Sequence, residues 1–387
     1  MCIEVLSFGY VFKQFLDVIT KMKIECDVLV VGGGPAGLSA ALLLSKKGIS
    51  TIVLEKNKSP GPQYTSYDIT EGPRIYNILK ELKIKPSKIS NVSEWLSPNY
   101  NFILDSKIED YYFKRGPEKD SIENILMKKL SKKNVDVLFE SHIDTLKIKK
   151  KQVTEITVKA AHEKTTIKSK YIIGADGAES SLRNKLKVET KTYATFRGAG
   201  IVVDSKEKDE VPHAKIYFDE QLAPGGYIYS GSVNNKSFFC VVIDDIFSKK
   251  IQLRDNLKKF LEQNLKREST TKNYFGGIGT SGIHNNHFEN VLFVGGSALF
   301  YDPFLGYGLN YAIESGYYAA CAIIKNNIDG YKEYVKEIQQ RIKDRYKARE
   351  IWRNADNKFF DELISNFHGE TVTNNKKILK ILELFVD

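Results

Sequence analysis

The 387-residue sequence predicts an α/β fold, α+β overall, in which a parallel sheet is joined to an antiparallel sheet and to a helical C-terminal region. Val28–Val31 is a short uncharged apolar run, followed by a glycine turn and a helical pattern, as expected for a strand buried on both faces. Apolar and polar residues alternate between Lys191 and Ile243, which favours antiparallel strands. The segment Tyr331–Asp387 has the pattern of charged amphipathic helices.

The turn after the first strand has the spacing G-x-G-x-x-G, with Gly32, Gly34 and Gly37 in the sequence GGGPAG, and Pro35 and Ala36 begin the helix. In this motif the first glycine makes the turn, the second lets the backbone touch a pyrophosphate, and the third permits close helix–strand packing. The helix N-terminus offers unpaired N–H groups to the anion. The strand, turn and helix therefore predict a Rossmann-like dinucleotide site, and an ordinary strand-to-helix turn is the weaker alternative.

A second strand, Ser50–Leu54, ends at an acidic residue, Glu55, which is followed by Lys56. The Glu55 carboxylate stands 18 residues after Gly37, where an acid can accept hydrogen bonds from ribose hydroxyls. Such an acid selects a ribose that has no 2′-phosphate.

Composition is that of a globular enzyme, with 42% hydrophobic and 27% charged residues. The formal net charge of +10 is spread along the chain, which we interpret first as a solubilising surface. Attraction to an anionic membrane surface is the alternative. No recognised reader motif supports a nucleic-acid partner.

The cysteines and histidines do not predict a metal or a disulfide framework. The four cysteines lie far apart without a C-x-x-C pair, which fits a reducing cytoplasm. His284 and His287 are close, but no third ligand is visible, so we expect no metal. No apolar run is long enough to cross a bilayer, so we expect a cytoplasmic protein, with peripheral contact on the inner face of the cell membrane as the further alternative.

The chain length favours more than one domain. The loop that begins at Pro60 and Gly61 continues through Tyr64–Gly72, either lining a site or lying plainly on the surface. We expect four parts: an N-terminal extension (1–23), a dinucleotide-binding domain (24–190 with 270–325, including an inserted segment of about 60–112), a substrate domain of β-sheet (191–269) and a C-terminal helical region (326–387).

Two further stretches have the composition of ligand loops. Ala175, Asp176 and Gly177 follow a buried strand, where an acid can reach a ligand at the carboxyl edge of a parallel sheet, although such an acid is as often a turn former. The loop from Pro303 to Gly308 has exposed amides and precedes a helix that begins near Leu309.

Together the three motifs resemble the FAD-dependent oxidoreductases of the para-hydroxybenzoate hydroxylase fold, over roughly residues 26–324. Within that group the chain is most similar to the geranylgeranyl reductase family, which includes archaeal enzymes that saturate isoprenoid chains of membrane lipids. The segment DPFLGYGLNYAIESG resembles the reductases' loop and helix. The segment Pro224–Tyr229 is similar to their P-x-x-Y-x-W motif, with Tyr229 for Trp, and Ala298-Leu299 stands where many hydroxylases carry Ala-His.

The resemblance implies bound FAD, with its adenosine over the Gly32–Glu55 region and its isoalloxazine ring against the Pro303–Gly308 loop. Hydride would pass from reduced flavin to a carbon–carbon double bond of a geranylgeranyl chain. Tyr227 and Tyr229 would line the apolar tunnel and are the candidates for proton donation. The cofactor-binding residues implied are Gly32, Gly34, Pro35, Ala36, Gly37, Glu55, Lys56, Arg115, Ala175, Asp176, Gly177, Gly296, Asp302, Pro303, Gly306, Gly308 and Leu309.

The implied partners are an isoprenoid lipid and an electron donor, either NAD(P)H or an acidic ferredoxin-like carrier. The chain departs from the family at Gly296, where an aspartate usually holds the ribityl chain of the flavin, and Asp302 is the residue that can compensate. It also has Ser230-Gly231 for Phe-Pro and no cysteine between Gly61 and Gly72. Two alternatives remain, a flavin-dependent monooxygenase of a small hydrophobic or aromatic substrate and a non-catalytic flavin-binding or electron-transfer protein.

Overall fold

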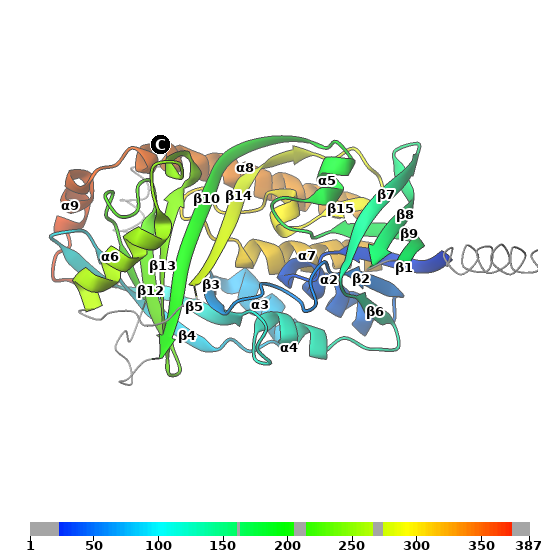
Figure 1. Ribbon diagram of the computed structural model, residues 1–387, viewed down its shortest axis with the longest axis horizontal. Coiled ribbons are helices and arrows are strands. Elements are labelled where there is room, and N and C mark those ends of the chain that lie inside the picture. The colour runs from blue at the N-terminus through cyan, green and yellow to red at the C-terminus, as the bar shows by residue number, and fades with distance from the viewer. Residues whose placement is uncertain (1–22, 161–162, 205–213, 266–273, 374–387) are drawn as a thin grey trace, which may run out of the picture.

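The computed structural model describes residues 23–160, 163–204, 214–265 and 274–373. Two sheets with helices between and around them form the described part of the chain (Figure 1). The expected N-terminal extension up to residue 22 lies outside the described residues.

The first sheet confirms the parallel sheet that the sequence predicts. Its strand order is β6-β2-β1-β9-β8-β7, with β15 paired to β9, and β6, β2, β1, β9 and β15 run parallel. β7 and β8 form an antiparallel hairpin beside β9. The strands are β1 (Lys23–Val31), β2 (Thr51–Leu54), β6 (Val135–Leu138), β7 (Ser141–Lys149), β8 (Gln152–Ala160), β9 (Glu163–Gly174) and β15 (Val291–Phe293).

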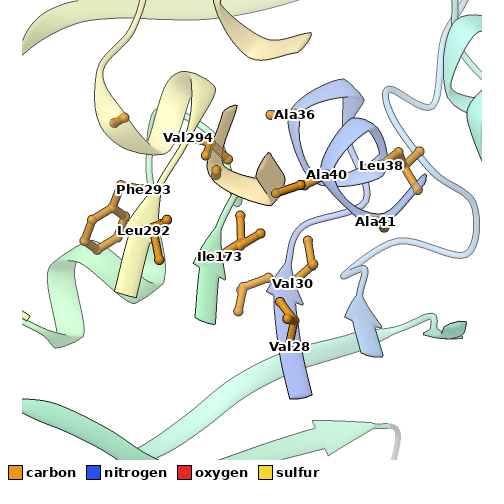
Figure 2. Close-up of a cluster of buried hydrophobic side chains, with 14 of the residues drawn as sticks. Val28, Val30, Ala36, Leu38, Ala40, Ala41, Ile173, Leu292, Phe293 and Val294 are labelled. Atoms are coloured by element: carbon orange, nitrogen blue, oxygen red, sulfur yellow. The ribbon is translucent and has the colours of Figure 1, made fainter. Parts of the chain in front are cut away.

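Two helices lie side by side against this sheet, α2 (Pro35–Lys46) and α7 (Leu309–Ile324). The central strands are apolar on both faces, and Val28, Val30 and Ile173 have no more than 1% exposed surface, which accounts for their uniform apolar pattern (Figure 2). A Cβ atom at Gly316 of α7 would collide with the carbonyl oxygen of Ala36 in α2. The absent side chain therefore sets how closely the two helices approach.

The second sheet is mostly antiparallel and has the order β14-β10-β13-β12-β11-β4-β5-β16, with β3 paired to β5. Its strands are β3 (Ser66–Glu71), β4 (Lys88–Leu96), β5 (Asn101–Arg115), β10 (Glu189–Asp204), β11 (Ala214–Tyr217), β12 (Tyr227–Val233), β13 (Lys236–Asp244), β14 (Tyr274–Asn285) and β16 (Thr371–Val372). The remaining helices are α3 (Pro73–Leu82), α4 (Ile122–Lys128), α5 (Ser181–Lys185), α6 (Leu253–Leu265), α8 (Ile328–Arg353) and α9 (Asn357–Ser365), with the short 3₁₀ helices η1 (Asp245–Phe247) and η2 (Gly295–Ala298).

One expectation, the loop after the second strand, needs correction. Most of the segment Tyr64–Gly72 is strand β3 rather than a loop, because residues 66–71 pair with β5 along their whole length. The strands that begin within the expected inserted segment of about residues 60–112, namely β3, β4 and β5, pair in the second sheet. The expected C-terminal helices are present as α8 and α9, but Thr371 and Val372 add a short strand to β5, and residues 374–387 lie outside the described residues.

The long helix α8 connects the two sheets. Its buried Arg349 donates to the Asp244 carboxylate at 2.6 Å, and Arg353 donates to the same oxygen at 2.7 Å, at the end of β13. Trp352 packs edge-to-face on Phe218 and Phe304. These contacts fix α8 across the second sheet.

We predict that Gly316→Ala destabilises the fold by about 1–3 kcal/mol, because the new methyl group must push α7 away from α2. Equilibrium unfolding in urea measures this loss. Gly198→Ala on β10 is the matched control, since the nearest atom to its new Cβ would be 3.5 Å away. Equal stability of Gly316→Ala and wild type would contradict the close helix packing.

Candidate functional site

The three glycines of the first motif occupy three different environments. Gly32 has φ +116°, and a Cβ there would collide with the Ala175 carbonyl, so this position makes the turn. A Cβ at Gly37 would collide with the Gly32 carbonyl, so this position sets the packing of helix on strand. Gly34 has no atom within 4 Å of its Cβ position and is the N-cap of α2 with no side-chain cap. The backbone at Gly34 is therefore open to a ligand.

The acid after the second strand is used within the turn. Glu55 is buried, and its carboxylate accepts hydrogen bonds from the backbone N–H groups of Gly33 at 2.9 Å and Asn57 at 2.8 Å. The neighbouring Lys56 is exposed. The two hydrogen bonds of Glu55 thus stabilise the backbone of the glycine turn, at the edge of the sheet where we expect the ribose.

The second motif forms a loop between β9 and α5. The Asp176 carboxylate accepts hydrogen bonds from Ser180 Oγ at 2.6 Å and from Leu182 N at 3.0 Å, so Asp176 stabilises the start of α5. Arg183 donates to the carbonyls of Ala178 at 2.6 Å and Ser297 at 2.7 Å. Arg183 therefore ties the second loop to the chain segment around η2.

Gly296, where the family usually has an aspartate, lies against this second loop. A Cβ there would lie 2.9 Å from Ala178 N and 3.2 Å from Gly177 C. An aspartate does not fit unless the Gly177–Ala178 backbone moves. Because Gly296 has no Cβ atom, η2 and the loop after β9 can approach each other closely.

The third loop, between η2 and α7, is shaped by Asp302. This carboxylate is fully buried, and Oδ1 accepts the N–H groups of Phe304 at 2.9 Å and Leu305 at 2.7 Å. The other oxygen, Oδ2, forms an ion pair with Arg345 of α8. Asp302 is therefore directed into its own loop and toward α8, with Pro303 buried beside it.

Glycines let aromatic rings approach the third loop. Gly306 has φ +68°, and its Cβ position is 2.8 Å from the Phe196 ring. A Cβ at Gly308 or at Gly279 would collide with the ring of Tyr301, which fills the space beside both. Gly308 is the N-cap of α7, has no side-chain cap and lines the cavity described below, so no side chain caps this helix N-terminus.

A cavity of about 530 Å³ lies between these loops and the second sheet. The loop side of its lining includes these sequence-predicted residues: Pro35, Arg115, Gly177, Gly296, Gly306, Gly308 and Leu309. Tyr227 and Tyr229 line it from β12. The other expected cofactor residues do not line this space; those are Gly32, Gly34, Ala36, Gly37, Glu55, Lys56, Ala175, Asp176, Asp302 and Pro303.

The two tyrosines hold the cavity wall through their hydroxyl groups. Tyr227 donates to the Leu305 carbonyl at 2.5 Å, and Tyr229 donates to the Tyr67 carbonyl at 2.7 Å. Burial raises the pKa of both hydroxyls well above 10, so both are neutral. Tyr227 thereby ties the second sheet to the third loop.

Several lining residues belong to none of the sequence motifs, among them Trp95 on β4, Cys240 on β13 and Phe275 on β14. They come from strands far apart in the chain. Burial raises the pKa of the Cys240 thiol far above 9, so the thiol is protonated and adds to the apolar wall.

Arg115 ends β5 and forms ion pairs with Asp68 of β3 and Glu123 of α4. Its side chain lines the cavity, and the ion pair with Glu123 holds it at the first turn of α4, which Ser121 caps. Thr70 also lines the cavity; its Oγ1 is buried and has no hydrogen-bond partner in the described part of the chain. These groups offer polar contacts to a ligand.

His284 is a buried side chain whose ring nitrogens have no partner within the described residues. Burial lowers its pKa to about 4, so the ring is neutral.

Among the residues that the structure describes, no three His, Cys, Asp or Glu side chains gather as a metal site. None of the described helices combines the length and apolarity that a membrane crossing requires.

A parallel sheet with an open glycine turn, beside a cavity walled by a second sheet, is the architecture of a flavin-dependent oxidoreductase. A family profile described as FAD binding domain matches residues 112–331, and one described as FAD dependent oxidoreductase matches residues 27–178. The first match covers more than half of the chain, and the protein belongs to this FAD-binding family. It is an FAD-dependent oxidoreductase, as the resemblance in its motifs predicts.

The chain is homologous to digeranylgeranylglycerophospholipid reductases. It is 26% identical to reductase 1 of Methanococcoides burtonii, over 89% of this chain and 83% of the relative. It is also 26% identical to the Methanocaldococcus jannaschii reductase, over 83% of each chain. A solved geranylgeranyl bacteriochlorophyll reductase-like protein from Thermoplasma acidophilum has the same fold, with a TM-score of 0.75, 21% identity and coverage of 94% and 97%. A flavin-dependent brominase shares the fold at a TM-score of 0.69 and 16% identity, covering 94% of both chains.

The open environment of Gly34 leads to a prediction about affinity. Gly34→Ala should leave the stability of the apoprotein within about 1 kcal/mol of wild type, because no atom meets the new methyl group. It should weaken FAD binding at least tenfold, or about 1.4 kcal/mol, because the methyl group obstructs the pyrophosphate. Flavin fluorescence titration measures the affinity. Gly37→Ala is the contrasting variant and should lose stability, and unchanged affinity in Gly34→Ala would refute the assignment.

The crowding around Gly296 leads to a prediction opposite to the family pattern. Gly296→Asp should lower both stability, by about 1–3 kcal/mol, and FAD content, because its Cβ lies too close to Ala178 N. Gly296→Ala adds the Cβ atom without the charge, and it should reproduce most of the loss of stability and of FAD content. Thermal unfolding and the flavin absorbance per protein give the two readouts. Tighter FAD binding by Gly296→Asp would show that the loops are not packed in this way.

Proposed function

We propose that the protein reduces carbon–carbon double bonds in the geranylgeranyl chains of a membrane lipid or of its precursor. The observation that carries this proposal is the cavity of about 530 Å³, which the cofactor loops line on one side and aromatic and apolar residues of the second sheet line on the other. An alkene has no polar group to bind, so its recognition requires such an apolar wall next to the reacting ring. The names of the homologous reductases support the same substrate class.

The residues present fit FAD. We assign the pyrophosphate to the open backbone at Gly34 and the N-terminus of α2, where N–H groups and the helix dipole favour an anion. We assign the ring to the Gly306–Gly308 loop and the uncapped N-terminus of α7. When bound, FAD supplies the hydride. The protein orients the ring and excludes water from the cavity.

Tyr227 and Tyr229 form the wall opposite this loop. Each hydroxyl proton is directed to a backbone carbonyl, so either residue would have to give up that hydrogen bond before it could protonate a substrate. We therefore propose that Tyr227 mainly fixes the distance between the sheet and the third loop, and that Tyr229 mainly ties β12 to β3 within the second sheet. Trp95 and Val242 complete the apolar surface that a chain of isoprene units would touch.

We further propose that the lipid enters from a membrane surface that the protein contacts peripherally, because the isoprenoid chains of the lipid have no appreciable solubility in water. The net charge of +10 favours contact with anionic head groups, and equally with an acidic ferredoxin-like carrier. NAD(P)H is the other donor that we propose.

The decisive experiment is an anaerobic reoxidation. We expect that the protein, loaded with FAD and reduced without O2, recovers its oxidised flavin spectrum when digeranylgeranylglycerophospholipid is added, and that each reduced bond gains two hydrogens by mass spectrometry. The fully saturated lipid is the control and should leave the flavin reduced. A monooxygenase would need O2 for reoxidation, and a non-catalytic flavoprotein would not respond to the lipid, so either result would refute the proposal.

A matched pair of variants links that reaction to the cavity. Ile216→Trp places a large ring into the cavity and should slow lipid-dependent reoxidation at least tenfold with an unchanged flavin spectrum. Ile148→Trp adds the same ring at the tip of the β7–β8 hairpin, where Ile148 is 45% exposed, and should have no effect.

A further inference from the structure

The cavity contains a pair of carboxyl groups that belongs to none of the sequence motifs. Glu71 ends β3, and Asp110 lies on β5. The two residues are register partners in the antiparallel pairing of these strands, and both line the cavity. Residues directly opposite in an antiparallel pair have their side chains on the same face, with Cβ atoms about 4.5–5.5 Å apart. Two acids thus share one part of the cavity wall.

The acid pair lies between solvent and the third loop. Glu71 is exposed, and its carboxylate accepts a hydrogen bond from the hydroxyl of Tyr307 at 3.3 Å. Tyr307 stands between Gly306 and Gly308 and also lines the cavity. Arg345 of α8 and Asp302 of the loop are the other charged groups that act on Glu71.

Asp110 is the more enclosed member. Ser90 of β4 is its register partner on the other side, and Lys88 and Tyr112 form the pair two positions further along the same strands. No ion pair between Asp110 and a lysine or arginine occurs among the described residues. Burial raises the pKa of Asp110 to about 7, and the negative charge of Glu71 adds to the effect. A carboxyl group with this pKa holds a proton at neutral pH and can release it.

We propose that the Glu71–Asp110 pair supplies the proton that completes alkene reduction, with Asp110 as the donor and Glu71 as its link to solvent. The inference rests on the proposed function. One alkene carbon receives the hydride, with two electrons, from reduced flavin, and the other carbon receives the proton from the Asp110 carboxyl. The π bond is replaced by two C–H bonds, flavin is oxidised, and the Asp110 carboxylate regains a proton from water through Glu71.

This assignment explains how protons reach an apolar cavity. Each reduced bond consumes one proton, and a lipid with several double bonds consumes several in succession. Tyr227 and Tyr229 are directed to carbonyls, whereas the acid pair faces the cavity on one side and water on the other.

Single-turnover reoxidation of the reduced holoprotein by digeranylgeranylglycerophospholipid tests the pair. Asp110→Asn should slow reoxidation about 100-fold, with FAD affinity unchanged. In the wild type the rate should fall as pH rises through about 7, because the donor loses its proton, and this dependence should be absent in Asp110→Asn. Glu71→Gln should move the fall to lower pH, because it removes the neighbouring negative charge. Glu109→Gln, an exposed acid on the same strand, is the matched control and should match the wild type.

A second readout does not depend on turnover. Infrared difference spectra of the oxidised holoprotein should show a carboxylic acid band that disappears as pH rises through about 7 and that Asp110→Asn lacks. Asp110→Glu, which keeps the acid, should retain such a band and part of the rate. A wild type that reduces the lipid while Asp110→Asn keeps the wild-type rate and pH profile overturns this inference alone. A wild type that leaves the lipid unreduced overturns the proposed function and this inference with it.

Discussion

The architecture depends on backbone approaching backbone at distances that only glycine permits. Gly32 and Gly37 bring the first strand, its turn and α2 together, and Gly316 lets α7 contact α2 at Ala36. Gly296 does the same for η2 and the loop after β9. Each contact draws a different part of the chain to the carboxyl edge of one parallel sheet. Because the sheet places these segments side by side, two helix N-termini without side-chain caps and three loops lie at the edge where we propose that the cofactor binds.

The second sheet is held to that edge by a few directional bonds rather than by apolar packing alone. Tyr227 bonds to the third loop, and α8 carries Arg345 to Asp302 and Arg349 to Asp244. A buried charge is tolerated only when it is paired, so these ion pairs restrict α8 to one position relative to both the loop and the sheet. The cavity is the space left between parts fixed in this way. Its volume is accordingly a property of the tertiary structure and not of any single motif.

The sequence was sufficient to predict the elements whose patterns lie within a few consecutive residues. The glycine turn after the first strand and the start of α7 at Leu309 both have patterns confined to a few residues, and the structure confirms these elements. The flavin-dependent family followed from three such patterns together, and the comparisons confirm it. The roles assigned to individual residues within the loops stay predictions.

Contacts between distant segments could not be predicted in the same way. β3 has a mixed polar pattern because it faces a cavity on one side, so its six residues resemble a loop in sequence. The approach of Glu71 to Asp110 is decided by strand register, and the orientation of Asp302 is decided by Arg345 on a helix that begins much later. The packing of Gly296 against Ala178 likewise joins segments that no sequence window contains. These contacts can be recognised only when the order and register of the strands are known.

The most direct test of this account is the absorption spectrum of the purified protein, combined with the stoichiometry of bound FAD after reconstitution. The account predicts an oxidised flavin spectrum with one FAD per chain, although Gly296 replaces the acid that relatives use, because backbone groups at Gly34, Gly306 and Gly308 form the site. A colourless protein that takes up no FAD on reconstitution would contradict it.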